Sequence, residues 1–217
     1  MERHTAPGQT RRALLRASCA IPVALGLVAS GRQRVMAQGK ALPPTPACTA
    51  QDNGTPSQTA GPFYKRSSPQ RTSLLEQGIT GPKIVVTGTV LSTDCQPIAQ
   101  ALLDFWQADA RGAYDNTGYR LRGHQFTDVT GHYTLETVVP GAYPGRTRHI
   151  HVKVQAPNQP VLTTQLYFPG ESHNATDGLF RPELLLTVQD VSDGKAATFN
   201  FVLESQPQKA RGHSRQD

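Results

Sequence analysis

Two histidines separated by one residue, His149 and His151, are the residues of this sequence best spaced for chemistry. They lie in RTRHIHVKV, residues 146–154, where β-branched residues favour a strand. On a strand, residues i and i+2 project from the same face, about 6 to 7 Å apart along the chain. The two imidazoles can therefore converge on one metal ion, although the same spacing also occurs in exposed or hydrogen-bonded histidine pairs.

Two tyrosines in stiff or irregular segments could complete such a centre. Tyr143 lies in VPGAYPGR, just before the histidines, and Tyr114 lies in ARGAYDN, after the segment that contains Trp106. A phenolate is a hard anionic ligand that suits a trivalent ion, and imidazole also binds iron. Two phenolates and two imidazoles around Fe³⁺ would leave a centre of charge +1, open to hydroxide or an anionic diol. Each tyrosine alone could equally be a packed residue with a hydrogen-bonded hydroxyl.

The order of these residues resembles the intradiol ring-cleavage dioxygenases, which include protocatechuate 3,4-dioxygenase and catechol 1,2-dioxygenase. The resemblance runs from TPSQTAGPFY, residues 55–64, to ATFNFVLE, residues 197–204. It includes DFWQADARGAYDN, a P-x-x-Y loop, an R-x-x-H-x-H motif and a strand with T-T-Q. The matching residues of this chain are Tyr114, Tyr143, Arg146, His149, His151 and Gln165.

The resemblance implies one Fe³⁺ per chain, held by the two tyrosines and the two histidines. The substrates would be a catechol-type aromatic diol and O₂, and the product a cis,cis-muconate. Tyr143 would be the displaced ligand that takes a substrate proton, Arg146 would stabilise negative charge on the attacked carbon, and Gln165 would hydrogen-bond ligand or substrate. The alternatives are a structural ion pair for Arg146 and an ordinary strand amide for Gln165. Tyr64 would line the substrate pocket. The chain departs from the usual R-P-A-H-x-H at Thr147 and Arg148; Arg148 should face away from His149, or else change the charge of the cleft.

The segments that must position these residues have the pattern of short strands separated by turn residues. We expect no amphipathic helix of ten or more residues between them. The expected strands span residues 83–91, 101–109, 131–139, 148–155, 161–168, 184–191 and 197–204. This pattern predicts an all-β fold, an antiparallel β-sandwich of about seven or eight strands. Three long segments interrupt it and are expected to build the site: residues 110–130, 140–147 and 169–183.

The basic character of the chain is concentrated at its start. Residues 1–37 hold six of the 22 basic residues but one of the 16 acidic residues, so the remainder is close to neutral and nucleic acid is not an expected partner. The pair Arg11 and Arg12 precedes an apolar run, residues 19–30, that is too short for a stable membrane span. The small residue Ala37 follows this run and offers a cleavage point. We expect a twin-arginine-type signal peptide and export of the protein; an uncleaved basic tail is the alternative.

Removal of that segment would leave two of the three cysteines, Cys48 and Cys95, in an oxidising compartment. We expect a disulfide between them, with two free thiols as the alternative. The predicted organisation is a signal peptide over residues 1–37, an extended arm over 38–60, the sandwich domain over 61–204 and a disordered tail over 205–217.

Two functions of other classes compete with the dioxygenase. A non-catalytic exported β-sandwich could bind a ligand, although it would not need tyrosines matched to H-x-H. A metal hydrolase could use the same histidines. The oligomeric state is open, with a homo-oligomer as one alternative. Trp106, His124, His132 and His173 are expected to be structural or exposed.

Overall fold

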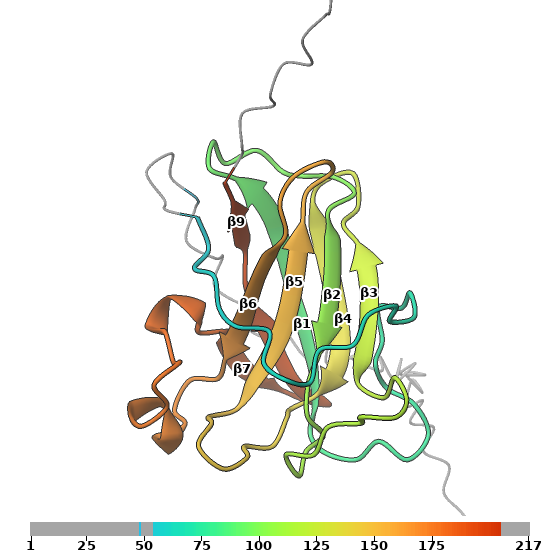
Figure 1. Ribbon diagram of the computed structural model, residues 1–217, viewed down its shortest axis with the longest axis vertical. Coiled ribbons are helices and arrows are strands. Elements are labelled where there is room, and N and C mark those ends of the chain that lie inside the picture. The colour runs from blue at the N-terminus through green and yellow to red at the C-terminus, as the bar shows by residue number, and fades with distance from the viewer. Residues whose placement is uncertain (1–47, 49–53, 205–217) are drawn as a thin grey trace, which may run out of the picture. The chain divides into compact units, whose positions relative to one another are not determined.

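The computed structural model describes Cys48 and residues 54–204, and the expected signal peptide, C-terminal tail and much of the arm lie outside these residues. The described elements are β1 (Lys83–Ser92), β2 (Leu102–Trp106), β3 (Arg122–Phe126), β4 (His132–Val138), β5 (His149–Gln155), β6 (Leu162–Tyr167), the short 3₁₀ helices η1 (Ser172–Ala175) and η2 (Pro182–Leu184), β7 (Thr187–Val191), β8 (Gly194–Thr198) and β9 (Phe201–Leu203). The all-β fold expected from the sequence is confirmed (Figure 1).

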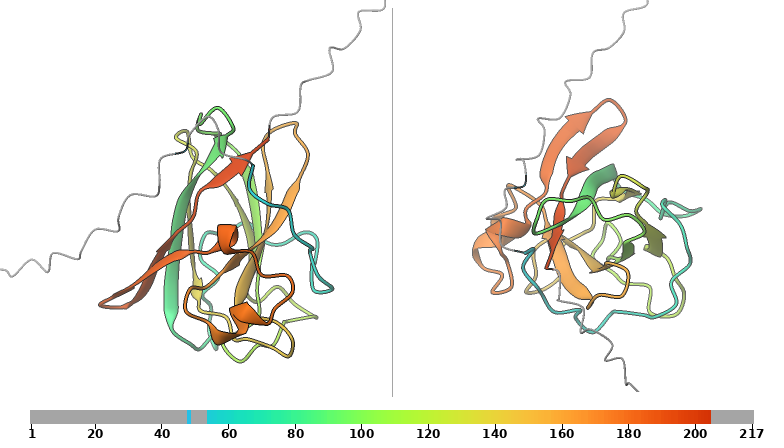
Figure 2. Two further views of the ribbon diagram at one scale, coloured as in Figure 1. Left: turned by 90° about the vertical axis from the view of Figure 1, so that its left-hand side faces the viewer. Right: turned by 90° about the horizontal axis from the view of Figure 1, so that it is seen from above.

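Two sheets face each other across one core, with β1 on one side and β5 on the other (Figure 2). One sheet has the order β4-β1-β8-β7, with β9 also paired to β1, and the other has the order β3-β2-β5-β6. Most pairs are antiparallel, but β8 and β9 both run parallel to β1. Alternate residues of the central strands fill the core; in β5 these are Ile150, Val152 and Val154, which are fully buried.

One strand was not expected from the sequence. Residues Arg122–Phe126 form β3 inside the segment 110–130, which the sequence pattern assigned to a loop. Its letters, RGHQF, are polar and include a glycine, so local propensity favours a turn. Pairing with β2 overrides that preference, and Gln125 and Arg122 are buried with their polar groups bonded to Thr134, Phe63 and Asp115.

Residues 54–82, the described segment before β1, form an extended arm that continues past the expected end at residue 60, and this segment is called the arm from here on. It crosses the outer face of the β3-β2-β5-β6 sheet (Figure 1). Backbone hydrogen bonds attach it at intervals: Thr55 N donates to Val202 O at 2.8 Å, Gln58 N to Thr163 O at 2.7 Å and Arg71 N to His124 O at 2.8 Å. The face opposite the core is therefore covered as well, which matters because the two histidines lie on it.

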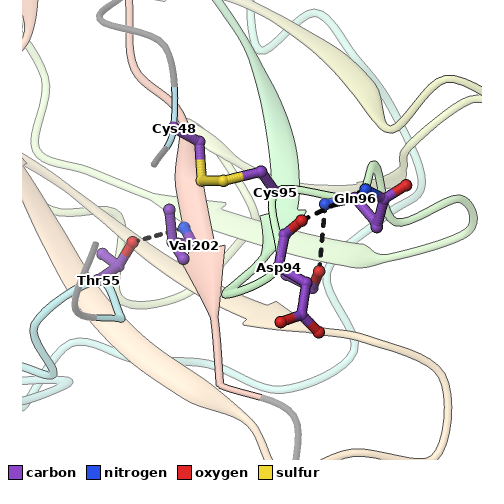
Figure 3. Close-up of a disulfide and its surroundings, with 7 residues drawn as sticks. Cys48, Thr55, Asp94, Cys95, Gln96 and Val202 are labelled. Carbon is purple, nitrogen blue, oxygen red and sulfur yellow. Dashed lines mark hydrogen bonds between the residues drawn. A yellow bond between two sulfur atoms is a disulfide. The ribbon is translucent and has the colours of Figure 1, made fainter. Parts of the chain in front are cut away.

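A disulfide joins Cys48 to Cys95, whose Cα atoms are 5.6 Å apart, and so ties the chain before the arm to the turn after β1 (Figure 3). No described helix is long or apolar enough to cross a membrane.

Replacing both cysteines, Cys48→Ser with Cys95→Ser, is expected to lower the free energy of unfolding. The bridge closes a loop with a sequence separation of 47 residues, and removing such a crosslink typically costs about 2 to 4 kcal/mol. We expect the lower end, about 2 kcal/mol, because Thr55 keeps its bonds to Val202. Urea unfolding measures the difference. A reducing agent should destabilise the unsubstituted protein and leave the variant unchanged; equal sensitivity of the two would contradict the prediction.

Candidate metal centre

Strand β5 holds both histidines on its outer face, as the spacing predicted. Their Nε2 atoms face each other at 3.1 Å. His149 Nδ1 lies 2.6 Å from Thr147 O, and since a carbonyl can only accept, this nitrogen carries the proton. The Nε2 lone pair of His149 is therefore directed toward His151. The register of the sheet places Trp106 of β2 on one side of His151 and Gln165 of β6 on the other.

The two tyrosines reach this point from different loops. Tyr143, in the loop after β4, places its hydroxyl oxygen 3.4 Å from His149 Nε2. Tyr114, in the loop after β2, has its ring centroid 5.9 Å from that of Tyr143 and 6.3 Å from that of His151. The structure thus brings together the four side chains that the sequence proposed as metal ligands.

Two glycines allow the tyrosine loops to meet. Gly112 has a positive φ of 86°, and a Cβ at this position would lie 2.4 Å from Ala142 O. A Cβ on Gly141 would lie 2.4 Å from Gly112 N. The two backbones are therefore in direct contact, and Gly141 N donates to Asp109 O at 2.7 Å. A side chain at either glycine would separate the loops and with them the two phenols.

The arm closes the centre from outside. Phe63 stacks on Tyr114, with centroids 4.3 Å apart and planes inclined by 16°, and meets Tyr143 edge-on. Gly61, with a φ of 63°, passes so close to His151 that an added Cβ would lie 3.5 Å from its Cε1. Beside His151 on the same face of the sheet, Trp106 stacks on its ring, with planes inclined by 3°. His149 and His151 are consequently 2% and 1% exposed, although they lie on the outer face of their sheet.

Burial sets the protonation of these groups in the metal-free protein. It lowers the pKa of His149 to about 4. Burial, with the neighbouring His149, lowers the pKa of His151 to about 2. Both imidazoles are therefore neutral at physiological pH, which is the form that binds metals. Burial and then the neighbouring Tyr143 phenol raise the pKa of Tyr114, so its phenol stays protonated unless a cation lies close.

One unpaired atom of this centre, a phenol oxygen, fits a bound cation. Tyr114 Oη is buried and has no hydrogen-bond partner among the described residues, an arrangement that costs free energy when nothing occupies the site. Four donors converge there, two phenol oxygens and two imidazole nitrogens, and this set suits ferric iron. The described residues contain no group of three or more His, Cys, Asp or Glu side chains placed to hold a metal ion; this centre combines His with Tyr instead.

Arg146 lies beside the tyrosine pair. Its Nη1 is 3.4 Å from Tyr143 Oη, its Nη2 donates to Gln165 Oε1 at 2.5 Å, and its Nε donates to Asp177 Oδ2 at 3.0 Å. Gln165 is buried, and its Nε2 donates to Thr59 O in the arm at 2.9 Å. The Gln165 side chain therefore contacts Arg146 and the arm, and its described side-chain hydrogen bonds do not include the four proposed ligands.

Tyr64 contacts the ring of Trp106, which in turn stacks on His151. Its hydroxyl donates to Asp104 Oδ2 at 3.1 Å, and its ring packs on Trp106 with centroids 4.8 Å apart. The amine of Lys153 lies 4.6 Å above the ring. Tyr64 thus supports the tryptophan that stacks on His151, and its described ring contacts do not include Tyr114 or Tyr143.

Arg148, the departure from the usual motif, points away from the centre. Its guanidinium pairs with Glu171 at 3.2 Å. The pair links the start of β5 to the segment after β6 and adds no charge beside the tyrosines.

Two contributors were not identified from the sequence. Phe63 lies inside the motif GPFY, so its position in a recognised motif was a usable signal. Asp177 lies in the segment 169–183, where nothing in the sequence distinguishes it from the other acidic residues.

A cleft of about 510 Å³ opens next to Tyr114. Residues 78–80 form one wall, and residues of the loop after β2, such as Ala113 and Arg120, form the other. Of the four proposed ligands, Tyr114 alone lines this cleft, because the arm covers the histidines.

Comparisons with known proteins match this chain to dioxygenases. A sequence family described as Dioxygenase (Dioxygenase_C) matches residues 59–205. The solved dioxygenase domain of a dioxygenase carbohydrate-binding protein fusion from Streptomyces sp. SirexAA-E is 56% identical, covers 71% of this chain and 100% of that chain, and superposes with a TM-score of 0.69. Catechol 1,2-dioxygenase from Candida albicans is 32% identical over 145 residues, which are 54% of this chain and 48% of that protein. The protocatechuate 3,4-dioxygenase beta chain of Burkholderia cepacia is 34% identical over 119 residues, 46% of this chain and 51% of that one. The chain spans about half the length of these curated relatives.

Proposed function

This chain belongs to the intradiol ring-cleavage dioxygenase family, and we propose that it is itself a non-haem Fe(III) intradiol dioxygenase. In this proposal it inserts both atoms of O₂ into a catechol-type diol and cleaves the ring between the two hydroxylated carbons, giving a cis,cis-muconate. The observation that carries the proposal is the convergence of Tyr114, Tyr143, His149 and His151 from three separate segments. One Fe³⁺ per chain is the cofactor that this donor set suits.

A ferric ion held by these four residues would supply Lewis acidity and draw electron density from a bound diol. The protein's own groups do the rest. The neutral imidazoles of His149 and His151 each have one ring nitrogen without a proton that can bind the ion. Tyr143, which that ion would hold as a phenolate, would receive a proton at Oη from a substrate hydroxyl. The Arg146 guanidinium, 3.4 Å from that oxygen, stabilises negative charge that develops on the ring.

The aromatic layer around the centre keeps water away from it. Phe63 covers Tyr114 on one side, and Trp106 covers His151 on the other. Excluding water strengthens the interaction of Arg146 with charge on the substrate. The cleft beside Tyr114 is the opening that this proposal assigns to the diol.

The test combines metal analysis, spectroscopy and product identification. The purified protein loaded with Fe³⁺ should be reddish, because phenolate bound to ferric iron absorbs visible light. It should consume one O₂ per catechol in an oxygen electrode, with a muconate as product, and a survey of substituted catechols would identify the preferred one. A colourless protein that contains iron would count against tyrosine ligation. Cleavage of any ring bond other than the one between the two hydroxylated carbons would contradict the proposed reaction.

We further propose that the protein is exported by the twin-arginine route, a proposal that the Arg11–Arg12 pair and the Cys48–Cys95 disulfide support. This route carries folded proteins, so iron could be bound before export. Replacing Arg11 and Arg12 together by lysine should retain the protein in the cytoplasm, as measured by cell fractionation. Undiminished export of that variant would refute the route.

A further inference from the structure

Asp177 is a buried carboxylate beside the centre, and its position is fixed by the backbone around it. Its Oδ1 accepts from Leu179 N at 2.9 Å, and its Oδ2 accepts from Thr147 N at 3.0 Å. The side chain is 2% exposed. Two amide donors therefore hold the carboxylate in place whether or not Arg146 is present.

The same Oδ2 atom also accepts from Arg146 Nε at 3.0 Å. The Arg146 side chain is 14% exposed, so its guanidinium is largely removed from water and depends on protein partners. Those partners are Asp177 at Nε, Gln165 at Nη2 and Tyr143 at Nη1. Since the guanidinium is planar and rigid, fixing Nε and Nη2 determines where Nη1 points.

The segment that carries Asp177 is attached to the residues around Arg146 at several points. Thr147 Oγ1 donates to Asn174 Oδ1 at 2.7 Å, and Arg148 pairs with Glu171 at 3.2 Å. Asp177 is the member of this set that bonds to Arg146 itself. The other contacts hold the segment but do not touch the guanidinium.

We propose that Asp177 is a positioning residue for the ring-cleavage reaction: it orients Arg146 so that the guanidinium faces Tyr143 Oη and the substrate ring. The inference rests on the proposed dioxygenase function. It adds a residue from the segment 169–183 to a centre otherwise built from the arm, two loops and β5.

Asp177→Asn is the variant that tests this role. One carboxylate oxygen becomes an NH₂ group, which then opposes either Leu179 N or the donors Thr147 N and Arg146 Nε. We expect kcat/KM for catechol to fall about ten- to a hundredfold, the range seen when groups that orient a ligand or catalytic side chain are removed. The visible absorption band of the iron-loaded variant should shift, because Arg146 Nη1 no longer faces Tyr143 Oη.

A measurement without iron separates orientation from catalysis. In metal-free protein labelled with ¹⁵N, the Arg146 Nε–H signal should be shifted by its bond to the Asp177 carboxylate and should move in the variant. Glu171→Gln is the matched control, since it breaks an ion pair of the same segment that faces away from the centre. It should leave kcat/KM, the visible band and the Arg146 signal unchanged.

A double-mutant cycle with Arg146→Gln decides between positioning and simple structural support. If Asp177 acts through Arg146, then Asp177→Asn causes no further loss of kcat/KM once Arg146 is replaced. Urea unfolding checks that each variant is folded. Should Asp177→Asn be too unstable, Asp177→Glu tests the same contact, because the longer side chain cannot accept from Thr147 N and Arg146 Nε in the same geometry.

The possible results separate failure of the positioning role of Asp177 from failure of the proposed dioxygenase function. An unsubstituted protein that cleaves no catechol would remove the proposed function and the positioning role together. An active unsubstituted protein would overturn the positioning role alone if Asp177→Asn kept kcat/KM within about twofold, or if its loss were the same with and without Arg146.

Discussion

Tyr114→Phe is expected to retain the fold and lose most of the bound iron, the visible absorption band and the activity. Phenylalanine keeps the stacking of this ring on Phe63, at 4.3 Å, but removes the oxygen that is buried without a partner. A ferric centre then has one phenolate in place of two, so a trivalent charge is less well balanced in a buried site. We expect kcat/KM to fall by more than about a hundredfold. About a hundredfold is the upper range for residues that only hydrogen-bond to a metal ligand, whereas Tyr114 is proposed to bind the ion directly. Iron analysis, the visible spectrum and oxygen uptake measure the three losses.

Tyr119→Phe is the matched control for this prediction. Tyr119 lies in the same loop, and its hydroxyl donates to Arg66 O at 2.9 Å. This variant loses a phenol oxygen that lies outside the proposed ligand set and should keep iron, colour and activity. If Tyr114→Phe also kept its iron and its band, the assignment of Tyr114 as a ligand would be wrong.

Gly88→Ala is expected to lower the free energy of unfolding by about 3 kcal/mol or more. Gly88 lies in β1 opposite the junction of β8 and β9, and an added Cβ would lie 1.7 Å from Phe199 O. The backbone is fixed on both sides of this point, since Phe199 N donates to Thr87 O at 3.0 Å and Thr89 N donates to Asn200 Oδ1 at 2.9 Å. The methyl group can be accommodated only if the two strands separate, which breaks these bonds.

Urea unfolding of Gly88→Ala and of Gly178→Ala measures this effect against a control. Gly178 has no atom within 4 Å of an added Cβ, so the same chemical change there should alter stability by less than about 0.5 kcal/mol. Equal effects of the two substitutions would show that the contact at Phe199 does not determine the cost.

The ligand set could be proposed from the sequence because each of its parts has a local signature. The period-two geometry of a strand places His149 and His151 on one face in any β fold, and the glycines next to each tyrosine mark loops. The resemblance to a known family then joined these segments, which spacing alone could not have done. The number of strands was underestimated at two places. β3 has a polar sequence, and only its pairing with β2 makes it a strand, while residues 197–204, expected as one strand, fall in the two strands β8 and β9.

Other features depend on contacts between residues that are far apart in the chain. Nothing local marks Asp177 as the partner of Arg146, since the two meet only because the segment after β6 folds back over the start of β5. The burial of the histidines likewise depends on the arm, which crosses their sheet from a position roughly ninety residues earlier.

The sequence by itself determined the all-β class of the fold, the donor atoms available for a metal and the face on which the two imidazoles lie, since these follow from residue type and backbone periodicity. Only the tertiary structure decided that the arm seals the centre, that two glycine-bearing loops bring the phenols together, and that Asp177 holds Arg146. These outcomes depend on packing and hydrogen bonding between distant segments, which local sequence patterns do not encode.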